Sequence, residues 1–289
     1  MRIPAFPADN SVIGPIPEWL DTRCGLYIGR FWHLHGFAET TEKSIHKSVY
    51  AVHIAKTAAT EIGIQMHFEE GITKKRIMKI LAHRGYWNAA IKKNSPLALR
   101  TALEKGYGFE SDVRDYTGRM VISHDIADAS CQDAEDVFRW LAEYSDRYCF
   151  AVNVKADGLK NQLQDCVRKY EISNYFLFDM SVPQMVEFAE TGLRFFTRQS
   201  EYETTPVLYG QAAGVWVDGF HGHEWIAEPL VRGHISSGKE VCIVSPDLHG
   251  NADYRDFWKR LVSWDMDFSK VLLCTDYPDE AKTFFKNIL

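Results

Sequence analysis

Short apolar segments rich in β-forming residues alternate with amphipathic segments along most of this 289-residue chain, from Met78 to its end. Eight segments have the pattern of buried strands, and helix-compatible stretches such as 96–105, 134–144 and 182–191 separate most of them. Strands that alternate with helices pair in parallel, so eight such units predict an α/β protein folded as a (β/α)8 barrel. A ninth segment, 120–124, follows a turn and predicts a hairpin extension of the second strand. The predicted barrel strands are 79–83, 108–113, 150–155, 175–180, 195–198, 214–217, 241–245 and 271–275.

The first 75 residues follow a different pattern, with four prolines among the first 17 positions that favour an extended or looped start. We therefore predict a small α+β N-terminal appendage over residues 1–75, with no role assigned, and a TIM-type barrel over residues 76–289. The elements expected in the appendage are a strand or hairpin at 26–37, a helix at 41–62 and a strand at 64–68.

Each predicted barrel strand is apolar and then ends in polar or charged residues. The first ends in His83-Arg84, the second carries Glu110 and Asp112, and the last runs into Asp276. In a β/α barrel the carboxyl ends of the strands form the mouth of the active site. One polar residue at one strand end can be a cap for the next helix, but polar residues at nearly every end favour a shared site.

Glu110 and Asp112 stand two residues apart on one strand, so both side chains point to the same face. Two carboxylates on one face suit the ligation of a hard divalent cation such as Mg²⁺ or Ca²⁺, which can bridge the protein and a phosphoryl oxygen. The alternative is a pair of solvated charges at a strand end. The neighbouring histidines favour the metal site.

His83 and His124 are candidates for a general acid and a general base, because imidazole titrates near neutral pH. Asp125 either orients His124 or caps a turn. Arg84 offers a planar fork that matches phosphate oxygens, and Lys155 adds a point charge; both are alternatively salt-bridge partners of the carboxylates. Together these residues suit the cleavage of a phosphodiester.

Further polar and aromatic residues follow the later strands and are candidates to line the same pocket. Trp216 is either an apolar wall for the leaving alcohol or part of the core. His221 and His223 lack the helical spacing of a metal pair, and hydrogen bonding within a loop is the favoured interpretation. The pocket candidates are Asp179, Glu201, Trp216, Asp218 and His249.

The ordered set of motifs closely resembles the signature of the glycerophosphodiester phosphodiesterase family, over residues 78–289 and nothing before. The resemblance implies His83 and His124 as the acid–base pair, with Arg84 and Lys155 contacting phosphate. It also implies a cyclic phosphate formed by attack of a substrate hydroxyl and then opened by water. The matching segments are His83-Arg84-Gly85, Asn94-Ser95, Glu110-Ser111-Asp112-Val113, Gly118 to His124-Asp125, and Thr275-Asp276-Tyr277-Pro278.

Two positions depart from the family pattern. Asn153 stands where the family has a glutamate that completes the metal shell, so the expected ligands here are Glu110, Asp112 and the Asn153 carbonyl oxygen. Lys93 stands where the family has another glutamate. The expected function is metal-dependent hydrolysis of a glycerophosphodiester or related polar diester to an alcohol and a phosphomonoester. The alternative is a barrel that binds a phosphorylated ligand without turnover.

The net charge of −6, without a basic block, argues against nucleic acid as a partner, and a small-molecule diester is expected instead. No window approaches the roughly 18 apolar residues of a membrane span, and the N-terminus has no secretory apolar run. Six scattered cysteines without a Cys-x-x-Cys pair are typical of a reduced, cytoplasmic enzyme. The oligomeric state stays open.

Overall fold

The computed structural model describes residues 78–145 and 147–286. The predicted appendage, with its strand or hairpin at 26–37, its helix at 41–62 and its strand at 64–68, lies outside the described residues.

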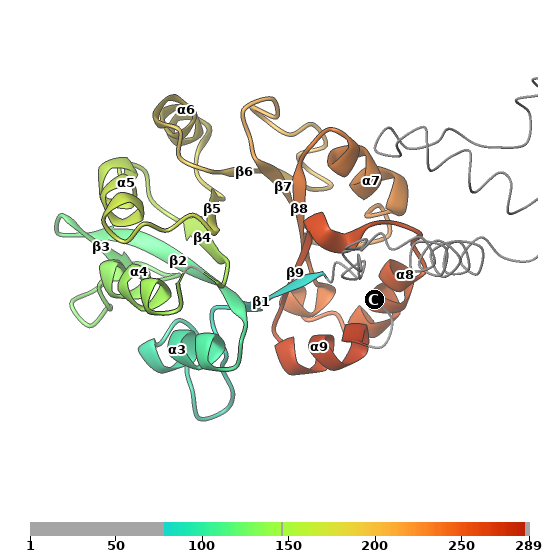
Figure 1. Cartoon of the computed structure of the whole chain (residues 1–289), viewed down its shortest axis with the longest axis horizontal. Helices are drawn as coiled ribbons and strands as arrows, with labels where there is room; N and C mark the ends of the chain where they lie inside the picture. The colour runs from blue at the N-terminus through green and yellow to red at the C-terminus, as the bar shows by residue number, and fades with distance from the viewer. Residues whose placement is uncertain (1–77, 146, 287–289) are drawn as a thin grey trace, which may run out of the picture. The chain divides into compact units, whose positions relative to one another are not determined.

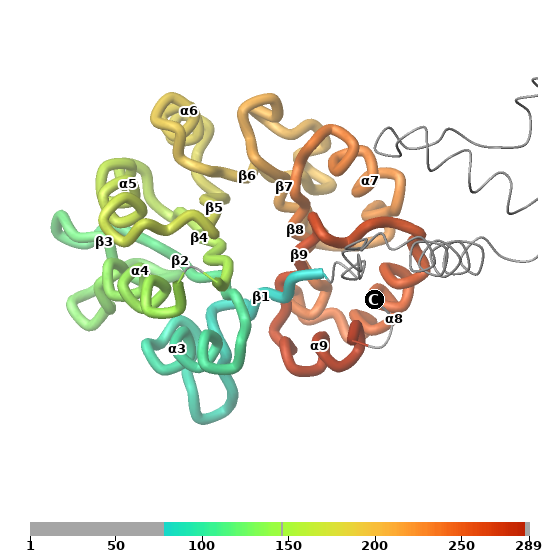
Figure 2. The backbone as a smooth tube through the Cα atoms, viewed as in Figure 1, coloured from blue at the N-terminus to red at the C-terminus, as the bar shows by residue number. Residues whose placement is uncertain are grey.

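Eight parallel strands form the predicted barrel, and helices surround them (Figure 1). The first and last strands pair with each other, so the chain path returns to its starting point (Figure 2). The circle is completed between the fourth and fifth barrel strands by one parallel bridge, Leu177 to Phe195, where the Leu177 N–H donates to the Arg194 carbonyl at 2.9 Å. In order around the barrel the strands are β5 (Tyr175–Phe178), β4 (Phe150–Val154), β2 (Gly108–Tyr116), β1 (Lys79–His83), β9 (Val271–Thr275), β8 (Glu240–Val244), β7 (Gly214–Val217) and β6 (Phe196–Gln199).

The predicted hairpin extension is confirmed: β3 (Arg119–Ile122) pairs antiparallel with the far end of β2. Local sequence signals mark the residues at which several helices begin. Ser95 and Ser181 accept the backbone N–H groups of Ala98 and Gln184, and proline stands in the first turn of both helices. The helices are α3 (Pro96–Glu104), α4 (Ala134–Glu143), α5 (Lys160–Lys169), α6 (Val182–Thr191), α7 (Glu228–Ser236), α8 (Tyr254–Val262) and α9 (Pro278–Lys286), with 3₁₀ turns η1 (Pro246–His249) and η2 (Phe268–Lys270).

The barrel interior is a packed core made by alternate residues of the strands. Phe176 stacks on Phe196 and Phe178 on Trp216, with ring centroids 3.8 Å apart in both pairs. The other residues of each strand point outward and pack against the helices in two larger apolar clusters. The interior cluster contains Leu81, Cys149, Ala151, Phe176, Phe178, Phe196, Trp216, Cys242, Val244, Leu272 and Cys274.

The same alternation leads from this core to the mouth of the barrel. A residue two positions after an inward-facing apolar residue also faces inward, and near the carboxyl ends these positions are polar. The interior is therefore apolar at its centre and charged at one end. The successive inward pairs are Leu81 and His83, Ala151 and Asn153, Phe196 and Arg198, Trp216 and Asp218, and Cys274 and Asp276.

Candidate active site

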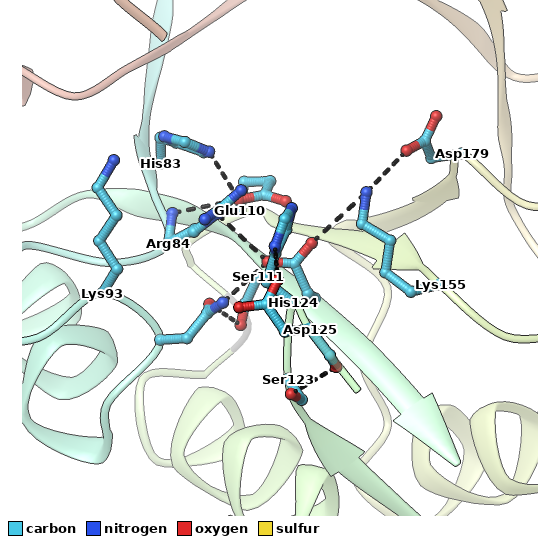
Figure 3. A network of polar contacts seen from close by, with 12 residues as sticks. His83, Arg84, Lys93, Glu110, Ser111, Ser123, His124, Asp125, Lys155 and Asp179 are labelled. Carbon is cyan, nitrogen blue, oxygen red and sulfur yellow. Dashed lines mark hydrogen bonds and ion pairs between the residues drawn. The ribbon is translucent and has the colours of Figure 1, made fainter. Parts of the chain in front are cut away.

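Glu110 and Asp112 are the most buried charged residues at the mouth, with exposed fractions of 2% and 0%. The strand register sets His83 beside Glu110 and Asp112 beside Asn153. His83 Nε2 lies 3.9 Å from Glu110 Oε2, and the Arg84 backbone N–H donates to the same oxygen at 3.1 Å (Figure 3). The structure thus brings the first predicted histidine and the predicted carboxylates together.

Asp112 is held on three sides. Asn94 Nδ2 donates to its Oδ2 at 2.8 Å, and the Asn94 side-chain oxygen Oδ1 in turn accepts a hydrogen bond from the Ser111 hydroxyl at 2.8 Å. Arg84 Nε lies 3.4 Å from Oδ2, and Lys155 Nζ lies 3.8 Å from Oδ1; both contacts are ion pairs without a hydrogen bond. Asn94 was noted in the sequence only as part of a motif, and its role in orienting Asp112 emerges from the fold.

Arg84 and Asp179 reach the mouth because the backbone leaves the strand in a left-handed conformation. Strict alternation would turn both side chains away from the interior, since each follows an inward-facing residue, His83 and Phe178. Their φ angles are 55° and 67°, a region that non-glycine residues seldom adopt. Backbone strain of this kind costs on the order of 1–3 kcal/mol and concentrates at functional sites.

Asp276 was noted in the sequence only as a polar strand end and as part of a motif, and its contact with His83 emerges from the fold. His83 Nδ1 lies 2.6 Å from Asp276 Oδ1, and Lys93 Nζ lies 3.0 Å from Oδ2. Because a carboxylate only accepts, Nδ1 carries the ring proton and leaves Nε2 facing Glu110. Burial lowers the pKa of His83, and Asp276 opposes that shift. Burial would raise the pKa of Asp276, yet His83 and Lys93 hold it below its usual range.

His124 comes from the loop after β3 and points into the same group in Figure 3. Its Nδ1 pairs with Asp125 Oδ1 at 2.8 Å, and its carbonyl accepts Arg114 Nε at 3.3 Å. The Asp125 side chain is 94% exposed, so it orients the ring only weakly compared with the buried partner of His83.

The side-chain oxygens of Glu110, Asp112 and Asn153 are suited to binding a hard divalent cation. Asp112 Oδ1 and Asn153 Oδ1 are both buried and have no hydrogen-bond partner. Burial and the neighbouring Asp112 charge raise the pKa of Glu110 well above its usual range, a shift that a bound cation would offset. Among residues 78–145 and 147–286, no three His, Cys, Asp or Glu side chains form a possible metal group. The third oxygen of the set proposed here is the side-chain amide oxygen of Asn153.

A second set of charged residues extends the network toward β5 and β6. Lys155 Nζ lies 3.0 Å from Asp179 Oδ2, and Asp179 also pairs with Arg198. Arg198 pairs in turn with Glu203, which is held in a turn where Ser200 accepts its backbone N–H at 3.0 Å. Arg198 was not selected from the sequence, although its inward position two residues after Phe196 is a signal that could have identified it.

The remaining pocket candidates divide between the mouth and its supports. His249 Nε2 lies 2.7 Å from Asp218 Oδ1 at the ends of β8 and β7. Trp216 is buried against Phe178, so it belongs to the core beneath the mouth and is not an open wall. Glu201 accepts the backbone N–H groups of Phe220 and His221 at 3.2 and 2.7 Å, and so fixes a loop.

The chain is similar to known proteins in its three-dimensional structure but not detectably in its sequence. No protein-family model matches the chain, and no curated protein matches it in sequence. Two similar structures are a glycerophosphodiester phosphodiesterase and a glycerophosphoryl diester phosphodiesterase, both from Parabacteroides distasonis ATCC 8503. The first has 16% identity and a TM-score of 0.58 and covers 73% of this chain and 97% of that one. The second has 12% identity and a TM-score of 0.57, with 75% and 88% covered.

A third similar structure is an Oleispira antarctica phosphodiesterase in complex with the product sn-glycerol-3-phosphate. It has 12% identity and a TM-score of 0.53, and the match covers 73% of this chain and 97% of that chain. At such identities these likenesses show that the barrel fold is shared.

Proposed function

We propose that the chain is a phosphoric diester hydrolase that acts on a glycerophosphodiester or a related polar diester. The observation that carries the proposal is the convergence of His83, Arg84, Glu110, Asp112 and Lys155 at one barrel mouth, with ion-pair distances of 3.4–3.9 Å. The names of the similar structures support the same reaction class.

His83 is the general base of this proposal. Its lowered pKa keeps the ring neutral at pH 7, and the proton on Nδ1 leaves the Nε2 lone pair free. Nε2 accepts the proton of the substrate hydroxyl next to the phosphate, whose oxygen bonds to phosphorus. His124 donates a proton to the departing alcohol as its P–O bond breaks. Water then opens the cyclic diester, the two histidines exchange roles, and a phosphomonoester leaves.

Arg84 and Lys155 bind the phosphate in this proposal. Arg84 Nε is a buried donor that makes no hydrogen bond, although it lies 3.4 Å from Asp112 Oδ2. Lys155 donates to Asp179 at 3.0 Å and lies 3.8 Å from Asp112, so its ammonium group keeps further protons for a phosphate oxygen. An unpaired buried donor is costly, so a phosphate oxygen is a favourable partner for it.

A divalent cation, Mg²⁺ or Ca²⁺, would be held by Glu110, Asp112 and Asn153. When bound it would neutralise charge on the phosphoryl oxygens. The unpartnered oxygens of Asp112 and Asn153 support this set. The amide at Asn153 supplies one negative charge fewer than a carboxylate, and this favours weak cation affinity or, as the second candidate, a barrel that binds without turnover.

We assign the activity to the cytoplasm and a small-molecule substrate. The thiols of Cys131, Cys166, Cys242 and Cys274 are free, which suits a reducing compartment. In the part of the chain that the structure describes, no helix is long and apolar enough to cross a membrane.

The test incubates the protein with glycerophosphocholine, glycerophosphoethanolamine or bis(p-nitrophenyl) phosphate, in the presence of Mg²⁺, Ca²⁺, Mn²⁺ or EDTA. His83→Ala and His124→Ala are expected to abolish turnover, and EDTA to reduce it. Turnover that both substitutions leave intact would refute the catalytic assignment. Binding of a phosphate ester without turnover, lost in Arg84→Ala, would establish the binding protein instead.

A further inference from the structure

The carboxylate that contacts His83 stands on a short segment between β9 and α9, residues 275–277, which we call the β9 turn. The place of the proton on the His83 ring depends on where this turn holds Asp276 Oδ1, because that oxygen accepts the proton of Nδ1 across only 2.6 Å. Trp87 and Lys93 hold the Asp276 side chain from the loop after β1, at 3.3 and 3.0 Å. Both contacts are made with the carboxylate, so the backbone of the turn is held by another group.

Asp247, in the 3₁₀ turn η1 after β8, holds the backbone of the β9 turn. Its Oδ2 accepts the Asp276 N–H at 2.7 Å and the Thr275 hydroxyl at 3.0 Å. The Thr275 hydroxyl oxygen in turn accepts the Tyr277 N–H at 3.0 Å. One carboxylate oxygen therefore anchors the two peptide N–H groups that flank the Asp276 side chain, the first directly and the second through Thr275.

Asp247 is a buried carboxylate whose charge is not balanced by a neighbouring cation. It is 8% exposed, and within residues 78–145 and 147–286 no cation is in ion-pair contact with it. Burial raises the pKa of Asp247, and hydrogen bonds, among them those from the Asp276 backbone and Thr275, oppose that shift. Hydrogen bonds to an ionised acceptor are stronger than those between neutral groups, so a carboxylate anchors the turn more firmly than a neutral side chain.

The chain beneath Asp247 is itself fixed to the barrel. β8 pairs with β9, and the Ser245 N–H donates to the Cys274 carbonyl at 2.9 Å. The indole N–H of Trp258, from α8, donates to the Ser245 hydroxyl at 2.9 Å, and both residues are fully buried. Asp247 thus has a defined position relative to β9, and its hydrogen bonds pass that position on to Asp276.

We propose that Asp247 is a positioning residue, which holds Asp276 where its carboxylate keeps the ring proton of His83 on Nδ1. No hydrogen bond or ion pair within the described residues joins Asp247 to His83, so the effect passes through the β9 turn. The inference rests on the proposed function only in that this tautomer serves as the general base; the tautomer itself is a property of the folded chain.

The first test reads the tautomer of His83 without turnover. The ¹⁵N chemical shifts of the imidazole nitrogens, measured on the full chain at about pH 8 where the ring is neutral, distinguish Nδ1–H from Nε2–H. The His83 signals are assigned by their absence in His83→Ala. We expect the ratio of the Nδ1–H to the Nε2–H tautomer to fall at least about tenfold in Asp247→Ala, because Asp276 is no longer held in place. Asp247→Asn, whose amide oxygen can accept the same two hydrogen bonds, and Thr275→Val, which loses only one of them, should show smaller falls.

The matched control is Gln184→Ala. Gln184 is 2% exposed, and its side-chain oxygen accepts the Gly158 backbone N–H, so it also anchors a loop at a strand end but without contact to His83. This variant should lose stability and keep the His83 signals. An unchanged tautomer ratio in folded Asp247→Ala would overturn the proposal, as would equal falls in Asp247→Asn and Asp247→Ala. If Asp247→Ala does not fold, an unchanged ratio in Thr275→Val overturns it instead.

The second test is kinetic and uses glycerophosphocholine, with the folded fraction measured by circular dichroism. We expect kcat of Asp247→Ala to fall about tenfold and KM to change less than about threefold, because Asp247 acts on the base and not on the phosphate-binding residues. A changed tautomer in a protein that hydrolyses no diester would leave the positioning role standing and refute the hydrolase. A changed tautomer with an unchanged kcat would refute the link between this anchor and catalysis.

Discussion

Asp276→Asn isolates the contact that we consider decisive for His83. The substitution keeps the size of the side chain and removes its charge. In the protein as it stands, the 2.6 Å contact fixes the proton on Nδ1 and leaves Nε2 free to act as a base. An asparagine can instead present its amide nitrogen to Nδ1, which would move the ring proton to Nε2, the atom that must accept a proton.

The expected loss follows from the energy of that contact. A hydrogen bond to a charged group contributes about 1.5–3 kcal/mol, which corresponds to roughly 10- to 150-fold in rate. A wrong tautomer adds to this, since the comparable change in a serine protease triad lowers kcat about 10⁴-fold. We therefore expect kcat to fall at least 30-fold, with a much smaller change in KM, because Asp276 does not touch the phosphate-binding residues Arg84 and Lys155.

The assay is steady-state turnover of a glycerophosphodiester, with the folded fraction measured on the same sample by circular dichroism. Asp279→Asn is the matched control, because Asp279 lies three residues further and bonds Tyr86, Tyr107 and Lys105, not His83. The control is expected to lower stability without lowering kcat. A fall of less than threefold in Asp276→Asn would refute the argument that this carboxylate sets the tautomer of His83.

Three further predictions concern Gly85, Asn94 and His234. Gly85 has a φ of 83°, and an added Cβ would lie 2.7 Å from the Ala98 backbone. Gly85→Ala is therefore expected to lower the free energy of unfolding, measured by urea denaturation, by about 2–4 kcal/mol. The control is Gly118→Ala, where φ is 82° but the space is open, and the decrease should be less than half as large. Asn94→Ala removes the 2.8 Å contact to Asp112 and should lower kcat/KM about tenfold, the equivalent of roughly 1.4 kcal/mol; an unchanged value would contradict the orienting role. Burial lowers the pKa of His234, so below about pH 6.5 the unfolded chain binds a proton that the folded chain does not. As the pH decreases, the free energy of unfolding should therefore fall by up to about 1.4 kcal/mol per pH unit. Urea unfolding at pH 7 and at pH 5.5 should show a smaller decrease in His234→Gln than in the unchanged protein.

Local sequence patterns were sufficient to predict the barrel and about half of the candidate site. Every predicted barrel strand is present, with small shifts such as 195–198 becoming Phe196–Gln199, because buried parallel strands are short apolar segments between helix signals. The pair Glu110 and Asp112 was also accessible, since the two-residue period of a strand fixes which side chains share a face. The convergence of His83 and Lys155 with these carboxylates follows from the rule that strand ends of a barrel meet.

Contacts between residues far apart in the chain could not be predicted from the sequence. Asp276 stands 193 positions after His83 and meets it because β1 pairs with β9 when the barrel closes. Trp216 and Glu201 were both reasonable pocket residues, yet one packs under the mouth and the other holds a loop. No local pattern separates these outcomes, because they depend on which side chain occupies the neighbouring strand.

The sequence by itself determined the alternation of strands and helices, the face on which each strand residue lies, and the chemical types gathered at the strand ends. These are local properties, set by the two-residue period of a strand and the burial of apolar side chains. Only the tertiary structure decided how those groups pair. Arg84 and Asp179 reach the mouth through left-handed backbone at the strand ends, and Asp276 becomes the partner of His83 through closure of the barrel, because both depend on neighbours far away in the chain.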